Sequence, residues 1–123
     1  MERDTRQRRA IRQALEQAGR PLGAPELLEA ARPFAPGIGM ATVYRTLKGL
    51  VESGALVAVE LPGEAPRYEA AGKEHHDHFR CRVCARVYEV DECPVKLPKL
   101  PKGFLLEGHE VVLLGLCAAC VKR

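Results

Sequence analysis

The sequence predicts an α+β protein made of two small domains, residues 1–72 and residues 73–123. Three observations predict this class. Apolar residues recur at helical spacing three times before residue 54, and two short apolar runs separated by a proline-glycine turn follow them. The second half contains mainly short runs that are typical of strands. A C-x-x-C pair lies near each end of that half.

Length and composition restrict the class of protein. A half of a 123-residue chain cannot bury a large core, so a bound metal or a dimer interface would help it to fold. No apolar run approaches the ~20 residues of a membrane span, and the charged N-terminus lacks the apolar stretch of a secretory signal. We therefore expect a cytoplasmic protein with no membrane partner. Cysteines stay reduced there, and their odd number, five, also argues against a disulfide framework.

Three helices are predicted in the first half, over residues 3–18, 24–32 and 41–53. The third has the clearest amphipathic pattern. Its buried stripe is expected to consist of Val43, Leu47, Leu50 and Val51. The remaining polar and partly cationic surface is expected to consist of Thr42, Tyr44, Arg45 and Lys48.

A hairpin is predicted after the third helix. Its strands cover residues 56–60 and 67–70, and P-G-E-A-P at 62–66 forms the turn. Three helices followed by a hairpin are the parts of a winged helix-turn-helix domain, in which the third helix enters the major groove of DNA. The same pattern is common in other proteins, so a different function stays open. Residues 70–73 are interpreted as a hinge into the second half.

The charge distribution allows two interpretations. The net charge is only +3, but residues 1–20 contain six arginines against three carboxylates. A local basic patch can follow a phosphate backbone while the whole molecule stays near neutral. A solvated helix face would give the same composition.

The second half is predicted to form a small sheet. Residues 76–81 and 86–90 form a hairpin, and residues 104–106 and 111–116 add one or two more strands. The run V-V-L-L-G-L at 111–116 is too continuous for a strand that is wet on one side. We therefore expect a homodimer that buries this run.

The two C-x-x-C pairs predict a structural zinc ion bound by four thiolates. The ligands would be Cys81, Cys84, Cys117 and Cys120. The 32 residues between the pairs are more than in a usual zinc ribbon, so we expect the pairs to clamp the two ends of the sheet.

The preceding residues, H-H-D-H at 75–78, predict a further metal. Side chains alternate in an extended segment, so His76 and His78 share one face while His75 and Asp77 share the other. One strand would then contribute to two metal sites. A solvated polar strand end, or a single site that uses all four residues, is the alternative.

The motifs resemble those of the ferric uptake regulator (Fur) superfamily along essentially the whole chain. A-T-V-Y-R-T-L at 41–47 resembles the recognition helix of the family. H-H-D-H-F-R-C-R-V-C at 75–84 and G-L-C-A-A-C at 115–120 resemble its metal-binding domain. The resemblance implies a metal-responsive repressor, not an enzyme, that binds palindromic operator DNA as a homodimer through a winged-helix domain and a C-terminal α/β dimerisation domain.

The resemblance also implies roles for individual residues. Tyr44 and Arg45 would contact bases, while Thr42, Lys48 and the arginines of residues 1–20 would hold phosphates. The four cysteines match the structural zinc ligands. The regulatory metal site would consist of Glu69, His76, His78 and Glu89. A possible further site would consist of His75, Asp77 and His109.

Two departures from the family pattern affect these roles. Members often place a histidine before the second helix, whereas this chain has G-R-P-L-G at 19–23, which weakens a peroxide-sensing interpretation. Lys96 occupies the place of a common glutamate, so either Glu92 or Cys93 substitutes in the further site or that site is absent. Cys93 is otherwise interpreted as a small buried apolar residue. Ala85, where such cysteine turns often have glycine, would be strained at positive φ.

The ligand types restrict the sensed metal only weakly. Two imidazoles and two carboxylates suit Fe²⁺, Mn²⁺, Zn²⁺ or Ni²⁺, and we favour iron or manganese slightly over zinc. Two other classes are considered. A zinc hydrolase would use His76, His78 and a carboxylate to hold a zinc ion with a bound water. For the repressor, in contrast, we expect no small-molecule substrate. An interaction module stapled by zinc would leave the histidines without a role.

Overall fold

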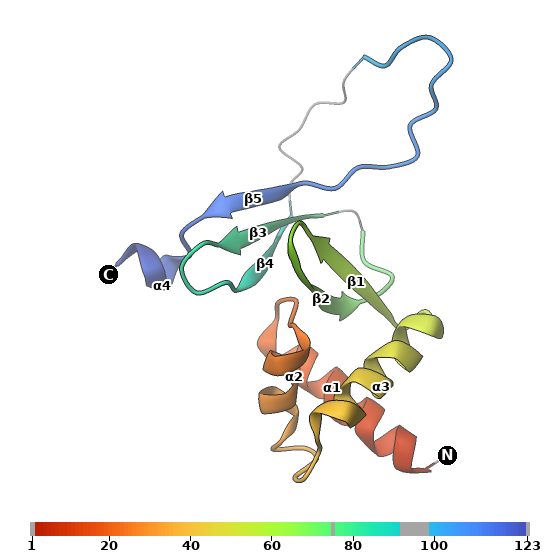
Figure 1. Ribbon diagram of the computed structural model, residues 1–123, viewed down its shortest axis with the longest axis vertical. Helices are drawn as coiled ribbons and strands as arrows, with labels where there is room; N and C mark the ends of the chain where they lie inside the picture. The colour runs from red at the N-terminus through yellow and green to blue at the C-terminus, as the bar shows by residue number, and fades with distance from the viewer. Residues whose placement is uncertain (1, 75, 92–98, 123) are drawn as a thin grey trace. The chain divides into compact units, whose positions relative to one another are not determined.

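The computed structural model of the chain describes residues 2–74, 76–91 and 99–122, with side chains from residue 6 onward (Figure 1). The chain forms two compact units, Met1–Lys73 and Glu74–Arg123, and each is described by itself. None of the described helices is both long enough and apolar enough to cross a membrane.

Unit 1 begins with three helices. They are α1 (Glu2–Ala18), α2 (Ala24–Ala31) and α3 (Met40–Glu52). Pro25 lies in the first turn of α2, where its missing N–H costs nothing. Gly54 follows α3 at φ 81°, a conformation that glycine adopts without strain, and so ends the helix. The three predicted helices are present, with bounds that differ by one residue from those expected.

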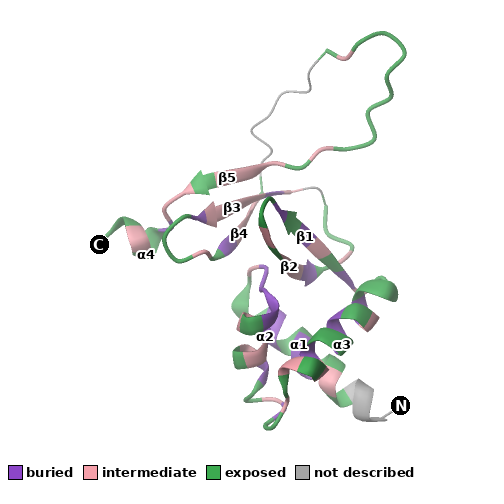
Figure 2. Ribbon diagram, in the orientation of Figure 1, coloured by how far each residue is buried: buried purple, intermediate pink, exposed green. Residues whose placement is uncertain are grey.

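The core of unit 1 lies where the three helices meet (Figure 2). Ile11, Leu27 and Leu47 are almost completely buried there. The buried stripe of α3 differs from the expected one, because Val51 is 36% exposed and Thr46 is buried instead. Positions 43, 46, 47 and 50 lie on one side of a helix with 3.6 residues per turn, and position 51 lies at the edge of that stripe.

A two-stranded antiparallel sheet, β1 (Leu56–Leu61) and β2 (Glu64–Ala70), follows the helices. The predicted turn at 62–66 is too long, because Pro66 is already in β2. Proline fits there since the register shifts between Val59 and Leu61, so no ladder hydrogen bond is required of it. The backbones of Leu22 and Tyr68 exchange two hydrogen bonds of 3.1 and 2.8 Å. The connection between α1 and α2 is thereby fastened to the hairpin.

Unit 2 contains a three-stranded sheet in the order β4-β3-β5, followed by a short helix. Its elements are β3 (Asp77–Cys81), β4 (Val87–Val90), β5 (Val112–Gly115) and α4 (Ala118–Val121). The pair β3–β4 is antiparallel, whereas β3–β5 is parallel. The sheet thus joins the C-terminal segment to the strand that precedes the first cysteine pair.

The strand predicted at residues 104–106 is wrong. These residues have no regular secondary structure and pair with no strand in the described chain; the amide of Phe104 instead donates to the carbonyl of Pro101 at 3.2 Å, and Leu105 is 82% exposed. A strand needs a neighbour for its backbone hydrogen bonds, and the apolar sequence alone does not supply one. In β5, Leu114 is 66% exposed, so part of the apolar run at 111–116 is uncovered in the single chain.

Candidate metal centres and recognition helix

The four paired cysteines come from three places in unit 2. Cys81 ends β3, Cys84 lies in the turn to β4, and Cys117 is the N-cap of α4, which contains Cys120. In the first pair, the amide of Ala85 donates to the carbonyl of Cys81 at 3.0 Å. In the second pair, the amide of Cys120 donates to the carbonyl of Cys117 at 3.0 Å. Each C-x-x-C pair therefore forms a tight turn that directs both sulfurs to one side.

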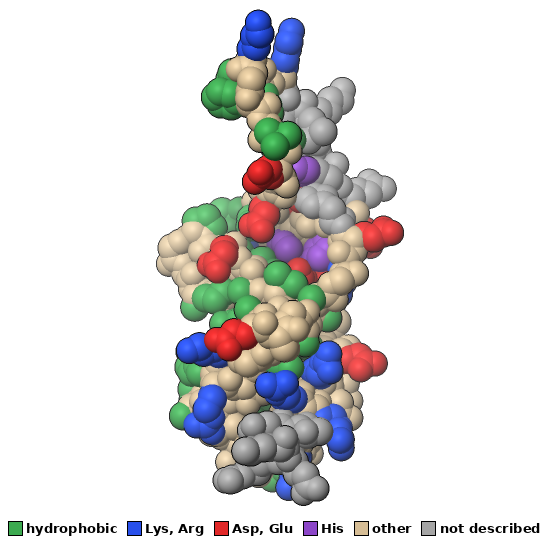
Figure 3. Space-filling model, turned by 90° about the vertical axis from the view of Figure 1, so that its right-hand side faces the viewer, with side chains coloured by type: hydrophobic (Ala, Val, Ile, Leu, Met, Phe, Trp, Pro, Cys, Tyr) green, Lys and Arg blue, Asp and Glu red, His purple; other side chains and the backbone are tan. Residues whose placement is uncertain are grey.

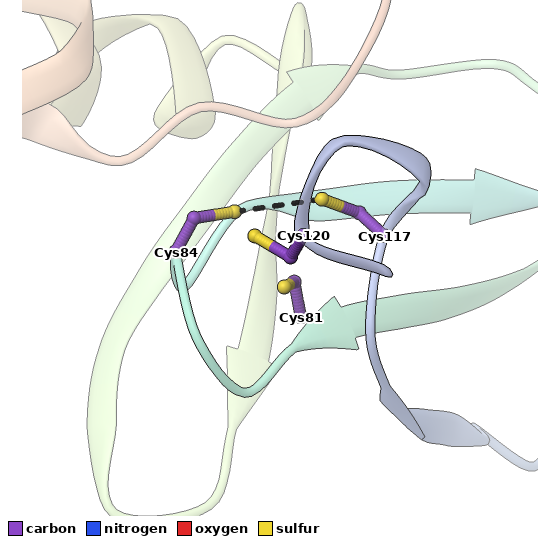
Figure 4. A group of neighbouring side chains, drawn as sticks. All are labelled: Cys81, Cys84, Cys117 and Cys120. Carbon is purple, nitrogen blue, oxygen red and sulfur yellow. Dashed lines mark hydrogen bonds between the residues drawn. The ribbon is translucent and has the colours of Figure 1, made fainter. Parts of the chain in front are cut away.

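The sulfur atoms form a compact group (Figure 4). All four Sγ atoms lie within 4.8 Å of one another, and those of Cys84 and Cys117 are 3.8 Å apart. In a zinc tetrahedron with Zn–S bonds of about 2.3 Å, neighbouring sulfurs are about 3.8 Å apart. The group thus has the donor atoms, the number and the spacing that zinc requires.

The thiols of this group do not ionise equally. Backbone hydrogen bonds from Cys84 and Cys117 lower the pKa of the Cys81 thiol to about 5. A backbone hydrogen bond from Cys120 lowers the pKa of Cys117, whereas burial raises the pKa of Cys120 to about 12. Thiolates at this separation repel one another, so four of them require a cation. The electrostatics of the group therefore also fit a divalent metal.

A second set of ligand atoms lies in unit 2, at the start of β3 and on β4. Nδ1 of His76 is 2.9 Å from the carbonyl oxygen of Glu74, which favours the tautomer that protonates Nδ1 and makes Nε2 the nitrogen with a lone pair that can bind a metal. That Nε2 lies 3.8 Å from Oε1 of Glu89. Two ligand atoms that are each about 2.1 Å from one ion cannot be more than about 4.2 Å apart, so this spacing fits a shared metal.

His78 adjoins this pair. Its ring centroid lies 4.8 Å from that of His76, with an edge-to-face arrangement, and His78 is directly opposite Glu89 in the β3–β4 ladder. The structure therefore brings His76, His78 and Glu89 together; the alternation of side chains predicted the shared side of the two histidines, and the family resemblance supplied Glu89. Glu69, the remaining predicted ligand, lies near the end of β2 in unit 1 and is 6% exposed.

The possible further site has less support. Asp77 is completely buried at the start of β3, and His109 is half-buried ahead of β5. Among the described residues, neither belongs to a group of three or more metal-ligand side chains. Its third predicted member, His75, lies outside the described residues, and so do Glu92, Cys93 and Lys96.

The predicted recognition surface lies on α3. Tyr44, Arg45 and Lys48 are exposed, and Thr42 is half-buried. Nη2 of Arg45 donates to the hydroxyl of Thr42 at 3.3 Å, so the two side chains form one polar patch. Unit 1, in the lower half of Figure 3, presents several lysine and arginine side chains on the face shown. Tyr44, Arg45 and Lys48 thus form an exposed, partly cationic surface on α3.

One residue near the cysteines was missed by the sequence analysis. Burial raises the pKa of the Tyr88 hydroxyl, and a side-chain hydrogen bond with Cys117 raises it further. The same bond lowers the pKa of Cys117, as expected when a hydroxyl donates to a thiolate. Tyr88 lies on β4, outside both cysteine pairs, and a tyrosine in a strand is ordinarily a packing residue. Only the fold reveals its contact.

Comparison with known proteins gives a consistent result. A sequence model described as the ferric uptake regulator family matches residues 2–113. The ferric uptake regulation protein of Campylobacter upsaliensis is 37% identical over 87 residues, which cover 68% of this chain and 56% of the relative. This chain thus spans little more than half the length of the Campylobacter relatives.

Other relatives match over greater lengths. The zinc uptake regulation protein of Mycobacterium tuberculosis is 32% identical over 122 residues, which cover 96% of this chain and 94% of the relative. A solved structure of a zinc-bound manganese uptake regulator is 27% identical and has a TM-score of 0.70, covering 90% of this chain and 87% of that one. The similarity includes both units.

Proposed function

Because the chain belongs to the ferric uptake regulator family, which consists of transcriptional regulators and not enzymes, we propose that it is a metal-dependent repressor. It binds palindromic operator DNA as a homodimer when its regulatory site holds a metal ion. The observation that carries the proposal is the second set of ligand atoms, in which His76 has one ring nitrogen fixed by a carbonyl and the other next to Glu89. A protein stapled by zinc alone has no need of that arrangement.

The two candidate centres have different roles in this proposal. The four-cysteine group is closed and structural: zinc held there ties α4 and β5 to the β3–β4 hairpin. The proposed regulatory site uses Glu69, His76, His78 and Glu89. Glu69 belongs to unit 1 and the other three belong to unit 2, so an ion bound by all four restrains one unit against the other. The cytoplasm, which we propose as the location, keeps the thiols reduced.

Restraining the units affects DNA binding through geometry. In a homodimer, the two copies of α3 must match half-sites about one helical turn apart. Tyr44 and Arg45 contact base edges and Thr42 and Lys48 contact phosphates in our proposal. Metal binding that favours the matching arrangement increases DNA affinity, and by linkage DNA increases metal affinity by the same factor.

The sensed metal is proposed to be iron or manganese, because the ligands are imidazoles and carboxylates without a thiolate. Zinc is the second candidate. The observation that favours it is the match to the Mycobacterium tuberculosis zinc uptake regulation protein over nearly the whole length of both chains.

Elemental analysis with DNA binding tests the proposal. The purified protein is analysed before and after mild chelation, and its binding is measured on a duplex selected by the metal-loaded protein from a random-sequence pool. We expect one resistant zinc per chain and a removable metal, and refilling with Fe²⁺, Mn²⁺ or Zn²⁺ identifies the ion that restores retardation of the duplex.

The double variant His76→Ala, His78→Ala separates the proposal from its alternatives. It should keep the resistant zinc and lose metal-dependent DNA binding. DNA affinity that is the same as in the unsubstituted protein at every metal concentration would indicate an interaction module stapled by zinc. Metal-dependent hydrolysis of model esters without DNA binding would indicate a hydrolase.

A further inference from the structure

Arg8 occupies an unusual position on α1. Arg8, Ile11 and Leu15 are spaced i, i+3 and i+7, so they lie along one side of the helix. Ile11 and Leu15 are buried in the core of unit 1. α1 packs against α3 in that core. Arg8 therefore lies on the same side of α1 as these buried residues, one turn closer to the N-terminus, and its side chain is exposed to solvent.

The guanidinium of Arg8 lies on α3 at Gly49. A Cβ atom added to Gly49 would be 3.0 Å from Nη2 of Arg8 and 3.9 Å from its Cζ. A side chain at position 49 would therefore crowd the guanidinium and push it away from its present position. Glycine inside a helix is unfavourable compared with alanine, and Gly49 is not at a positive φ that would require it. Admitting Arg8 is the structural reason for a glycine at this position.

The surroundings of Arg8 leave its charge available. Among the side chains that the structure describes from residue 6 onward, none forms an ion pair or a hydrogen bond with Arg8. Arg45 lies one helical turn before Gly49, and Lys48 lies next to it. Residues four apart on a helix are neighbours, so Arg8 extends the cationic surface of α3 beyond its own side chains.

We propose that Arg8 binds a backbone phosphate of the operator duplex and that Gly49 is a positioning residue that lets Arg8 lie across α3. This inference rests on the proposed DNA-binding function. A phosphate is the partner because the N-terminal part of a recognition helix reads base edges, while Gly49 is in the C-terminal half of α3. A guanidinium also binds a phosphate through two parallel hydrogen bonds.

Gly49→Ala gives a test in which two measurements move in opposite directions. The added Cβ meets only the far end of a flexible side chain, so it displaces the guanidinium without disturbing the backbone. The better helix propensity of alanine should raise the melting temperature of the metal-loaded protein. Affinity for the selected duplex should nevertheless fall by about tenfold, the size expected for one lost charge-assisted hydrogen-bonding contact.

Arg8→Gln and the double variant complete the cycle. Arg8→Gln should weaken binding by a similar factor and reduce the slope of log K against log salt by about 0.9, one phosphate contact. Adding Gly49→Ala to Arg8→Gln should cause no further loss, because the displaced group is already absent. Arg32→Gln is the control for charge, since Arg32 follows α2 and pairs with Glu29. It should bind as the unsubstituted protein does.

Three outcomes would overturn the inference. One is that Arg8→Gln binds the duplex with unchanged affinity and salt slope. Another is that Gly49→Ala keeps full affinity while Arg8→Gln loses it, which removes the positioning role. The third is that the losses from the two substitutions add. These three outcomes are interpreted only after the unsubstituted protein has been shown to bind the duplex. If the unsubstituted protein binds the duplex with none of the metals and also not without metal, the proposed function itself is overturned.

Discussion

Ala85 is the one non-glycine residue with positive φ among the described residues, at 64° in the turn of the first cysteine pair. An L-residue in this conformation costs about 1–2 kcal/mol because Cβ approaches the carbonyl oxygen. The turn nevertheless forms, since it brings Cys81 and Cys84 to one side. Strain at the residue scale is thus accepted for the geometry of the metal site.

Ala85→Gly should relieve this strain. We expect the free energy of unfolding of the zinc-loaded protein to rise by about 0.5–1 kcal/mol, the strain removed minus the greater entropy of glycine in the unfolded chain. Denaturant unfolding monitored by circular dichroism measures it. Ala85→Val is the opposing variant and should destabilise. Equal stability of the two variants would contradict the prediction.

Tyr88→Phe tests the contact between the hydroxyl of Tyr88 and Cys117. Removing the donor while keeping the ring should leave one zinc per chain but accelerate its transfer to a chelator by about tenfold, as is typical when an outer hydrogen bond to a metal ligand is lost. The rate is followed with a chromogenic zinc chelator. Tyr68→Phe, in unit 1, is the matched control and should release zinc at the original rate.

The sequence predicted residues that act through their own chemistry and missed those that act through a contact. The cysteine spacing and the alternation of His76 and His78 follow from local chain geometry. The contact of Tyr88 with Cys117 and the place of Arg8 against Gly49 depend on which elements pack together, and no local pattern encodes that packing; the sequence predicted only that the N-terminal arginines hold phosphates. The same reason explains the error at Val51, which was predicted to be buried but is 36% exposed. It lies at the edge of the helical stripe, where the sequence pattern alone does not determine burial.

At the scale of elements, a network of charges joins α2 to the hairpin. Arg67 of β2 donates to the carbonyl of Ala65 at 2.7 Å and to Glu64 at 3.0 Å, and its Nε lies 3.9 Å from Glu26. Glu26 also accepts from the Gly23 amide, which caps α2. The network and the backbone pairing of Leu22 with Tyr68 therefore both hold the α2 region against the β1–β2 hairpin.

Arg67→Met should weaken the connection between α2 and the β1–β2 hairpin. The side chain of Arg67 is only 11% exposed, so the substitution removes part-buried hydrogen bonds to Ala65 and Glu64 and the ion pair with Glu26, and we expect a loss of about 1–3 kcal/mol in the free energy of unfolding. Arg32→Met is the matched control. Its pair with Glu29 has an arginine that is 53% exposed, so its loss should cost less than about 0.5 kcal/mol. If both variants lost a similar free energy of unfolding, the charge network around Arg67 would not be the source of the stabilisation.

Element order was only partly predictable. The helices and the hairpins are local and their signals are strong. The parallel pairing of β5 with β3 joins residues more than thirty positions apart, and nothing in either strand specifies that neighbour. The error at residues 104–106 has the same origin, since an apolar sequence can become a strand only where a partner edge is available.

At the scale of the whole molecule, the proposed homodimer should depend on the exposed apolar side chain of Leu114. Leu114→Lys places a charge where we expect the second copy to pack, so the variant should be a monomer in analytical ultracentrifugation with its zinc retained. Its DNA affinity should fall sharply, because one monomer engages one half-site.

Val57→Lys is the control for this dimer prediction, since Val57 is also exposed but lies on β1 of unit 1. It should stay dimeric. A dimer that survives Leu114→Lys unchanged would assign the interface to another surface.

The parallel strand β5 and the four-cysteine group together have a consequence for chain length. The segment between β4 and β5 is closed at its base, by the sheet on one side and by the clustered thiols on the other. The entropy of closing a loop rises only with the logarithm of its length, so doubling this segment would cost about 0.6 kcal/mol. An insertion at the exposed residues 101–103 should therefore cost little free energy of unfolding, so a reporter peptide or an affinity tag can be grafted there without unfolding the protein.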